Sequence, residues 1–354
     1  MDLSRMLRSL RAEVQGAFPF LHGHQVKAMS EATLSMIAAG HCQLSRMAVI
    51  ELGRATVPSC ERRWQRLVAN ERLDSEAMIT SWARAVLSDV AQVTLILDET
   101  PKRNDLRAMK LCRQIHGRAI PVVWSCYKPD ALPMTQDRLV VHLLEQADRA
   151  LPEGAEPTLL ADRGLSWPQV LDFCTEHNWH YVLRAQAQTR VKLDDGRELR
   201  FGDLAPRPGA QWCGPAWVFK KAGWRRSNLV AYWQPDTGEP WLLITDLAAN
   251  RHRCRQYCKR MRIEQSFRDE KSSGFQWNQS RVRDPEHATR LLLIMALAMR
   301  HLIYLGLSLI RAGKRWLLER RDRRTLSVFQ LGLRYVQRSR RQARSPPRKI
   351  SVGN

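Results

Sequence analysis

The stretch Val93-Thr-Leu-Ile-Leu97 is a run of strand-favouring, mostly apolar residues, and Asp98 follows it directly. Such a run is typical of a strand that is buried on both faces of a sheet. Further strands and helices are predicted downstream: strands at 106–114, 118–126, 157–161 and 179–185, and helices at 135–151 and 167–177. Their order, with three strands first, indicates an α/β domain with a mixed sheet flanked by helices. No glycine-rich nucleotide-binding motif accompanies it.

The regions before and after these elements have different residue patterns. Residues 1–88 show helical periodicity and predict a helical N-terminal domain, with Arg62, Arg63 and Arg66 along one helix. This domain suits DNA end binding, but its 11 basic and 8 acidic residues equally allow a dimerisation or packing role. Within a catalytic core at 89–312, residues 186–246 predict a β-rich insertion.

The charge of the chain is strongly positive. It has 354 residues, with 57 Lys and Arg against 35 Asp and Glu, a net charge of +22. Residues 311–354 alone carry 14 basic and 2 acidic side chains. A surface so basic implies a polyanionic partner, either nucleic acid or an acidic membrane. The segment 313–354 is expected to be a basic C-terminal tail, disordered after about Arg338.

Three further features bear on location and redox state. No apolar signal segment opens the chain, and its eight scattered cysteines favour reduced thiols. The spacing His252-x-Cys254-x₃-Cys258 matches no familiar zinc site. The apolar run 291–310 could span a bilayer, but Arg300 and His301 at its middle favour a buried helix. A cytoplasmic protein with no membrane partner is predicted.

Carboxylates at two strand ends suggest chemistry. Asp98 and Asp162 each follow a predicted buried strand, and ligands gather beyond the carboxyl ends of such strands. A single Asp there is more often a turn former. A helix at 251–273, stopped by Gly274, would place Glu264 on one face with a tyrosine and two cations: Tyr257, Arg260 and Lys271. Three acids with a basic rim suit Mg²⁺ and a phosphate backbone.

The spacing Tyr257-x₂-Arg260-x₃-Glu264-x₆-Lys271 resembles the Tyr–Arg–Glu–Lys signature of bacterial cut-and-paste insertion-sequence transposases of the DDE superfamily. Leu97-Asp-Glu-Thr100 and Ala161-Asp-Arg-Gly164 resemble the two upstream Asp motifs of that family. The resemblance spans about residues 93–309.

The resemblance implies a ribonuclease H-like fold in which Asp98, Asp162 and Glu264 are catalytic and bind two Mg²⁺ ions, with Mn²⁺ able to substitute. It also implies a homodimer that pairs two inverted-repeat ends in the bacterial nucleoid, cuts them through a hairpin and joins them to target DNA. The residues expected to contact DNA are Tyr257, Arg260, Lys271, Arg163 and Arg268.

Three points stay open on the sequence alone. A metal-dependent nuclease without strand transfer would use the same triad, and an inactive, domesticated relative would bind DNA without chemistry. The insertion contains five tryptophans, of which the family uses one to stack on a flipped base: Trp212, Trp217, Trp224, Trp233 and Trp241. Most of the five are expected to lie in the core of the sheet.

Overall fold

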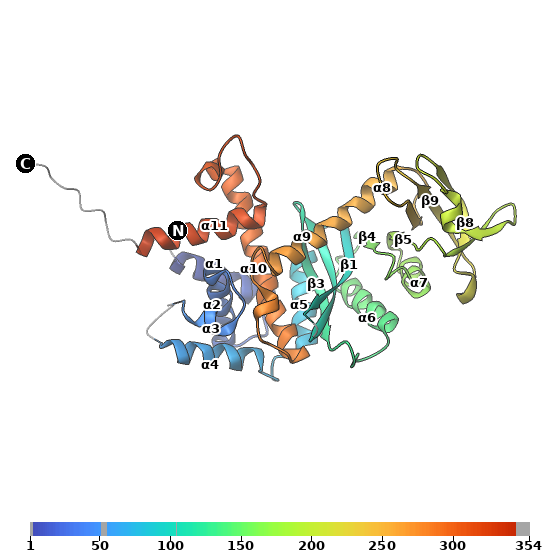
Figure 1. Cartoon of the computed structure of the whole chain (residues 1–354). Helices are drawn as coiled ribbons and strands as arrows, with labels where there is room; N and C mark the ends of the chain where they lie inside the picture. Colours follow the sequence, from blue (N-terminus) through green and yellow to red (C-terminus); the bar gives the residue numbers. More distant parts are fainter. Residues whose placement is uncertain (1–2, 51–54, 104, 345–354) are drawn as a thin grey trace, which may run out of the picture. The chain divides into compact units, whose positions relative to one another are not determined.

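The structure is a computed structural model that describes residues 3–50, 55–103 and 105–344. The chain divides into two compact units (Figure 1). One is Trp82–Gln265, and the other combines Met1–Ser81 with Ser266–Asn354. Each unit is described by itself.

The sheet of the unit Trp82–Gln265 begins with five strands in the order β3-β2-β1-β4-β5. Their bounds are β1 Gln92–Lys102, β2 Leu106–Ile115, β3 Arg118–Tyr127, β4 Glu156–Ala161 and β5 His180–Arg184. Strands β1, β2 and β3 are antiparallel, whereas β1, β4 and β5 are parallel. Helix α6 (Gln136–Asp148) contacts β2 and β3, and α7 (Pro168–Glu176) contacts β5. The predicted element order is confirmed, and so is the ribonuclease H-like α/β class.

The predicted β-rich stretch continues the same sheet. Strand β10 pairs antiparallel with β5, and the order then runs β9-β8-β6-β7. The bounds are β6 Arg190–Leu193, β7 Glu198–Arg200, β8 Gln211–Val218, β9 Arg225–Tyr232 and β10 Trp241–Thr245, with short 3₁₀ turns at η1 Phe201–Leu204 and η2 Lys220–Ala222. All five tryptophans of this stretch are half-exposed, so the expectation that most lie in the core is wrong. Trp212 and Trp217 lie on β8 and Trp241 on β10, while Trp224 and Trp233 lie next to the two ends of β9.

The predicted helix at 251–273 is interrupted. It consists of α8 (His252–Tyr257), the 3₁₀ turn η3 (Cys258–Arg260) and α9 (Met261–Glu270). Residues in a 3₁₀ turn are separated by a larger angle about the helix axis than the 100° of an α-helix. The predicted placement of Glu264, Tyr257, Arg260 and Lys271 on one face therefore holds only approximately. Gly274 does not end the helix in a left-handed conformation. A Cβ there would lie 2.0 Å from the Asp269 carbonyl oxygen, so close packing is what requires glycine.

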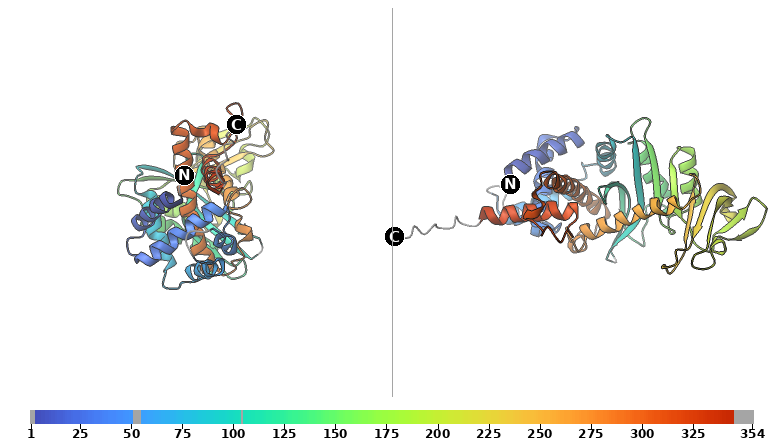
Figure 2. Two further views of the ribbon diagram at one scale, coloured as in Figure 1. Left: turned by 90° about the vertical axis from the view of Figure 1, so that its left-hand side faces the viewer. Right: turned by 90° about the horizontal axis from the view of Figure 1, so that it is seen from above.

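The other unit is helical and draws on both ends of the chain (Figure 2). Its N-terminal helices are α1 Leu3–Ala17, α2 Gly23–Ala39, α3 Leu44–Ala48, α4 Val57–Val68 and the start of α5 Ser75–Leu87; its C-terminal elements are η4 Trp277–Gln279, α10 Pro285–Arg311, η5 Lys314–Leu317 and α11 Val328–Arg344. Helix α10, which the sequence placed with the catalytic core, packs on α2, α4 and α11. The apolar sides of α2 and α10 cover each other, which explains why residues so far apart share one core.

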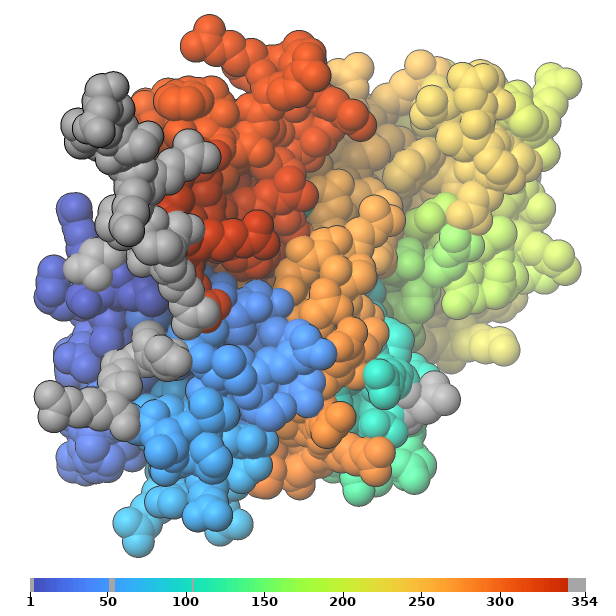
Figure 3. Space-filling view, turned by 60° about the vertical axis from the view of Figure 1, so that its left-hand side comes forward, coloured from blue at the N-terminus to red at the C-terminus, as the bar shows by residue number. Residues whose placement is uncertain are grey.

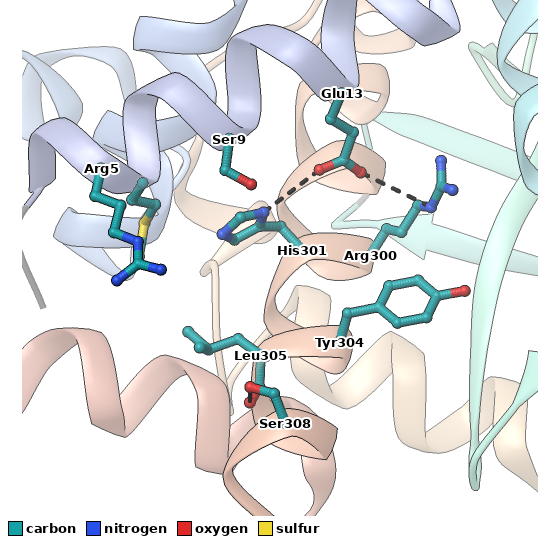
Figure 4. Close-up of a pocket in the computed structure, with 9 residues that line it drawn as sticks. Arg5, Ser9, Glu13, Arg300, His301, Tyr304, Leu305 and Ser308 are labelled. Carbon is teal, nitrogen blue, oxygen red and sulfur yellow. Dashed lines mark hydrogen bonds and ion pairs between the residues drawn. The ribbon is translucent and has the colours of Figure 1, made fainter. Parts of the chain in front are cut away.

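Helix α10 carries the long apolar run, and by length and composition it could cross a membrane, although most of that run is buried within the unit. Arg300 and His301, at the middle of the run, both face Glu13 of α1 (Figure 4). Glu13 lies 3.8 Å from the Arg300 guanidinium and 3.4 Å from His301 Nδ1. These residues line a hollow of about 570 Å³ together with Arg5 and Tyr304.

The basic C-terminal segment is more ordered than predicted. Helix α11 continues to Arg344, so the expected disorder does not start at Arg338. The Arg340 guanidinium donates to the Ala38 carbonyl oxygen at 3.0 Å, which ties the end of α11 to the end of α2. Residues 345–354, including Arg348 and Lys349, lie outside the described residues.

Candidate active site

The first two acids lie at one end of the same pair of parallel strands. Strands β1 and β4 pair as far as Leu97 and Ala161, and Asp98 and Asp162 are the residues that follow in each chain segment. Asp98 is still inside β1, because this strand continues beyond β4 by pairing with β2. The prediction that Asp98 lies at a strand end is therefore corrected, while its position beside Asp162 is as expected.

The third acid joins them through Arg260. The Arg260 guanidinium nitrogen Nη2 lies 2.8 Å from Asp98 Oδ2, 3.3 Å from Asp162 Oδ2 and 3.7 Å from Glu264 Oε1. The Arg260 side chain is only 9% exposed. One buried cation thus contacts carboxylates from β1, from the end of β4 and from α9. Its Nε atom is buried without a hydrogen-bond partner among the described residues.

Tyr257 closes one side of this cluster. Its buried hydroxyl donates to Asp162 Oδ1 at 3.2 Å, and its ring packs edge-on against Trp241, with centroids 5.3 Å apart. The Arg184 guanidinium lies 5.4 Å from the Trp241 ring centroid. Burial raises the pKa of Tyr257, so the hydroxyl stays protonated and acts as a donor.

The electrostatics of Asp98 are dominated by burial. Desolvation raises the pKa of Asp98 to about 6, against the attraction of Arg260 and a hydrogen bond from the Glu99 backbone N–H. The nearby Glu264 and Asp162 raise it further. Burial alone would lower the pKa of Arg260, but the attraction of Asp98 and its neighbours raises it on balance. Three carboxylates share this one guanidinium, so the number of acidic groups at the site exceeds the number of cations that contact them.

The donor chemistry of the site fits a divalent ion. Carboxylate oxygens from three elements converge on one point, and hard cations such as Mg²⁺ prefer oxygen ligands. In its present arrangement the guanidinium of Arg260 stands at that point. No group of three or more His, Cys, Asp or Glu side chains in residues 3–50, 55–103 and 105–344 has the spacing of a metal centre. Asp98, Asp162 and Glu264 are nevertheless the residues that would hold such ions.

Comparison with known families agrees with this geometry. Residues 135–300 match the transposase DDE domain. This match supports a transposase of the DDE superfamily. The match includes Asp162, Tyr257, Arg260 and Glu264, whereas Asp98 precedes it and is placed by the structure alone. No curated protein matches the sequence. Members of this superfamily are enzymes of DNA transposition, and they generally use divalent metal ions.

The remaining residues predicted to contact DNA are Arg163, Arg268 and Lys271. Arg163 follows Asp162 but forms a bidentate ion pair with Glu239, with N–O distances of 2.6 and 3.0 Å. Glu239 also accepts a hydrogen bond from Arg184. Arg268 and Lys271 come after Gln265 and belong to the helical unit. Arg268 is exposed on α9, and the Lys271 backbone N–H extends the last turn onto the Phe267 carbonyl. Their contacts with DNA stay predictions.

The sequence interpretation missed a second polar cluster beside the acids. Glu99, next to Asp98 on β1, pairs with Arg107 and accepts from the Tyr127 hydroxyl and from the Gln136 amide at 2.9 Å. Alternation along a strand puts Glu99 and Asp98 on opposite faces of the sheet. The Leu97-Asp-Glu-Thr100 motif contained this residue, but only the register with β2 and β3 identifies its partners.

Proposed function

We propose that the protein catalyses cut-and-paste transposition of an insertion sequence, using two Mg²⁺ ions held by Asp98, Asp162 and Glu264. The observation that carries the proposal is the convergence of all three carboxylates on Arg260 Nη2, within 3.7 Å. The match to the transposase DDE domain supports the choice of DNA as substrate. Mn²⁺ would substitute, since it accepts the same oxygen ligands.

The chemistry requires little of the protein beyond charge and position. When bound between such carboxylates, paired divalent ions activate the attacking oxygen and stabilise the leaving oxygen of a phosphodiester. The role of the chain is to hold the acids on β1, on the end of β4 and on α9, and to hold the DNA strand. Tyr257 orients Asp162 through its hydroxyl, and the buried Arg260 balances the carboxylates.

The contacts with DNA belong to the same proposal. Tyr257, Arg260 and Lys271 would position phosphates beside the cleaved bond, with Arg163 and Arg268 as further contacts. Of these residues, Arg260 and Tyr257 already contact the acids, and Arg163 is paired with Glu239. DNA phosphates would have to compete with those carboxylates. Arg268 is exposed and carries no such ion pair among the described contacts.

The order of events proposed is hydrolysis of one strand, attack of the freed 3′-OH on the opposite strand to form a hairpin, reopening, and joining to target DNA. A homodimer would bring the two inverted-repeat ends together. The net charge of +22 supports a partner with a dense phosphate backbone.

The test is a strand-transfer assay on labelled duplex that carries the inverted repeat flanking the reading frame. With Mg²⁺ or Mn²⁺ we expect a nicked strand, a hairpin and then a joined product, and with EDTA none of these. Cleavage without joining would identify a nuclease. Binding without cleavage, in either metal, would identify an inactive DNA-binding relative.

A further inference from the structure

An unusually exposed tryptophan lies in the segment that connects α10 and α11. This segment, residues 313–327, is called the Trp316 loop below; it lies at the surface of the helical unit (Figures 1 and 3). The Trp316 side chain is 60% exposed, the largest value among the exposed large apolar side chains of the described residues. A single exposed apolar side chain is ordinary on a protein surface, so the meaning of Trp316 depends on the residues around it.

The surroundings of Trp316 are cationic. The ring lines a hollow of about 380 Å³ together with Ile310, which is also exposed. The other side chains around it are Arg315, Glu319, Arg320, Arg321 and Arg324. Arg320 pairs with the exposed Asp322. Arg321 and Arg324 are exposed and have no ion pair among the contacts of the described residues.

The Trp316 loop is held in shape by its own contacts. Glu319 has a side chain only 6% exposed; it pairs with Arg315 and accepts from the backbone N–H groups of Thr325 and Leu326, both at 2.9 Å. Arg315 in turn donates to the Leu326 carbonyl at 3.1 Å. Arg338 of α11 donates to the Leu317 carbonyl. The backbone that carries Trp316, Arg321 and Arg324 is therefore held in shape before any partner arrives, which lowers the entropy cost of binding.

Charge decides which partner fits. A second copy of this chain, with its own net charge of +22, would bring positive charge against four arginines. A nucleic acid supplies phosphates for the guanidinium groups and flat bases for the ring. In a duplex the faces of the bases are covered by stacking, whereas an unpaired strand leaves them open to an aromatic side chain.

We infer that the Trp316 loop binds an unpaired DNA strand, with a base stacked on Trp316 and flanking phosphates contacted by Arg321 and Arg324. The inference rests on the proposed function only in taking DNA as the partner. Asp98, Asp162 and Glu264 belong to the other unit and have no part in it. Binding at this loop can therefore be measured without any cleavage.

The experiment uses the full chain in EDTA and compares a labelled oligothymidylate of about 20 nucleotides with a duplex of the same length. This length exceeds the roughly 4–16 nucleotides that one OB-fold domain covers on a single strand. We expect Trp316→Ala to weaken binding of the single strand by about 5- to 100-fold, and binding of the duplex by less than about 2-fold. Trp316→Phe keeps a ring and should recover most of the affinity. Because Trp316 is exposed, neither variant should change the thermal midpoint.

A double variant tests the arginines. Arg321→Ala with Arg324→Ala should weaken both DNAs and lower the log–log salt slope by about 1.5–2. The control is Arg138→Ala with Arg149→Ala, two exposed residues in or beside α6 that remove the same charge and should change single-strand binding far less.

Three outcomes would overturn the inference: equal losses for single strand and duplex in Trp316→Ala, no loss for either, or a changed sedimentation coefficient with unchanged single-strand binding. The last would make the loop a self-association surface. A wild-type protein that fails the strand-transfer assay, yet binds single strands in a Trp316-dependent way, would refute the proposed function alone.

Discussion

The Arg260 guanidinium donates a 2.8 Å hydrogen bond to the Asp98 carboxylate, although the two residues lie 162 positions apart in the sequence. Both side chains are largely buried, with 9% and 12% exposure. A buried ion pair of this kind does not repay the full cost of removing both charges from water. The raised pKa of Asp98 reflects that cost, and a buried carboxyl group with such a shift is a candidate for a functional site.

The first prediction concerns stability against pH. The pKa of Asp98 rises from its ordinary 3.8 to about 6 in the folded protein, mainly through burial. Between these values the unfolded chain binds fewer protons than the folded one, so the free energy of unfolding should fall as pH rises from about 4 to about 6. The loss should reach about 3 kcal/mol. Asp98→Asn cannot titrate and should lack this part of the profile.

The measurement is urea unfolding in EDTA at pH values across that range, for both proteins. Arg260 keeps Asp162 and Glu264 as partners in the variant, so its charge is not left unpaired. The unfolding free energies of the two proteins should diverge with rising pH in favour of Asp98→Asn. Parallel profiles would contradict the buried, destabilising role assigned to Asp98.

The second prediction separates chemistry from binding. Asp98→Asn, Asp162→Asn and Glu264→Gln should each abolish cleavage of end DNA while leaving its affinity within a few-fold of wild type, because affinity comes mainly from basic contacts with phosphate. Cleavage is followed on labelled end DNA with Mg²⁺, and affinity is measured in EDTA. Wild-type cleavage by any one variant would remove that residue from the proposed triad.

The third prediction concerns the residues that position the acids. Arg260→Ala should lower the cleavage rate by on the order of 100-fold or more, because the three carboxylates lose the cation that holds them together. The salt slope of DNA binding should change by about 1 at most. Tyr257→Phe should be milder, since it loses only the 3.2 Å bond to Asp162.

Matched variants make this comparison interpretable. Arg255→Ala removes an exposed arginine from α8, and Tyr181→Phe removes a hydroxyl bonded to Ser227 at 3.0 Å, away from the acids. Both should cleave at near wild-type rates. Lys271→Ala should reduce cleavage more than binding if it grips a phosphate beside the cleaved bond. Equal losses across all these variants would indicate a general effect on folding.

The sheet of the unit Trp82–Gln265 was predictable because its signals are local. A buried strand such as 93–97 can be recognised from its continuous apolar residues, and Asp98 and Asp162 each follow such a run. The prediction of a single helix at 251–273 was wrong because nothing in the apolar pattern marks a 3₁₀ turn at Cys258–Arg260. The placement of α10 against α2 and α4 depends on contacts between residues more than two hundred positions apart, which no local pattern reports.

The fourth prediction revises the role of the C-terminal segment. Removal of 345–354 takes away two cations, Arg348 and Lys349, and should lower the salt slope of DNA binding by at most about 2. The thermal midpoint should not change. Removal of 339–354 also deletes the end of α11 and the bond from Arg340 to Ala38, so it should destabilise the helical unit as well. Identical midpoints for the two truncations would show that this contact contributes nothing.

The fifth prediction tests the crossing of α10 and α11, where two glycines let the backbones approach. A Cβ at Gly306 would lie 1.9 Å from the Val328 carbonyl oxygen, and one at Gly332 would lie 2.1 Å from the Leu302 carbonyl oxygen. Backbone atoms cannot move aside as a flexible side chain can. Gly306→Ala should therefore separate the helices and destabilise the protein by about 3 kcal/mol or more.

The matched control is Gly16→Ala in α1, where a Cβ meets nothing within 4 Å. Alanine is a better helix former than glycine, so this variant should be neutral or more stable by up to about 1 kcal/mol. Urea unfolding of both variants gives the comparison, and cleavage of end DNA reports whether the helical unit matters for activity. If Gly306→Ala unfolded at the wild-type urea concentration, the close contact of α10 with Val328 would be incorrect, and with it the packing that joins the two ends of the chain into one unit.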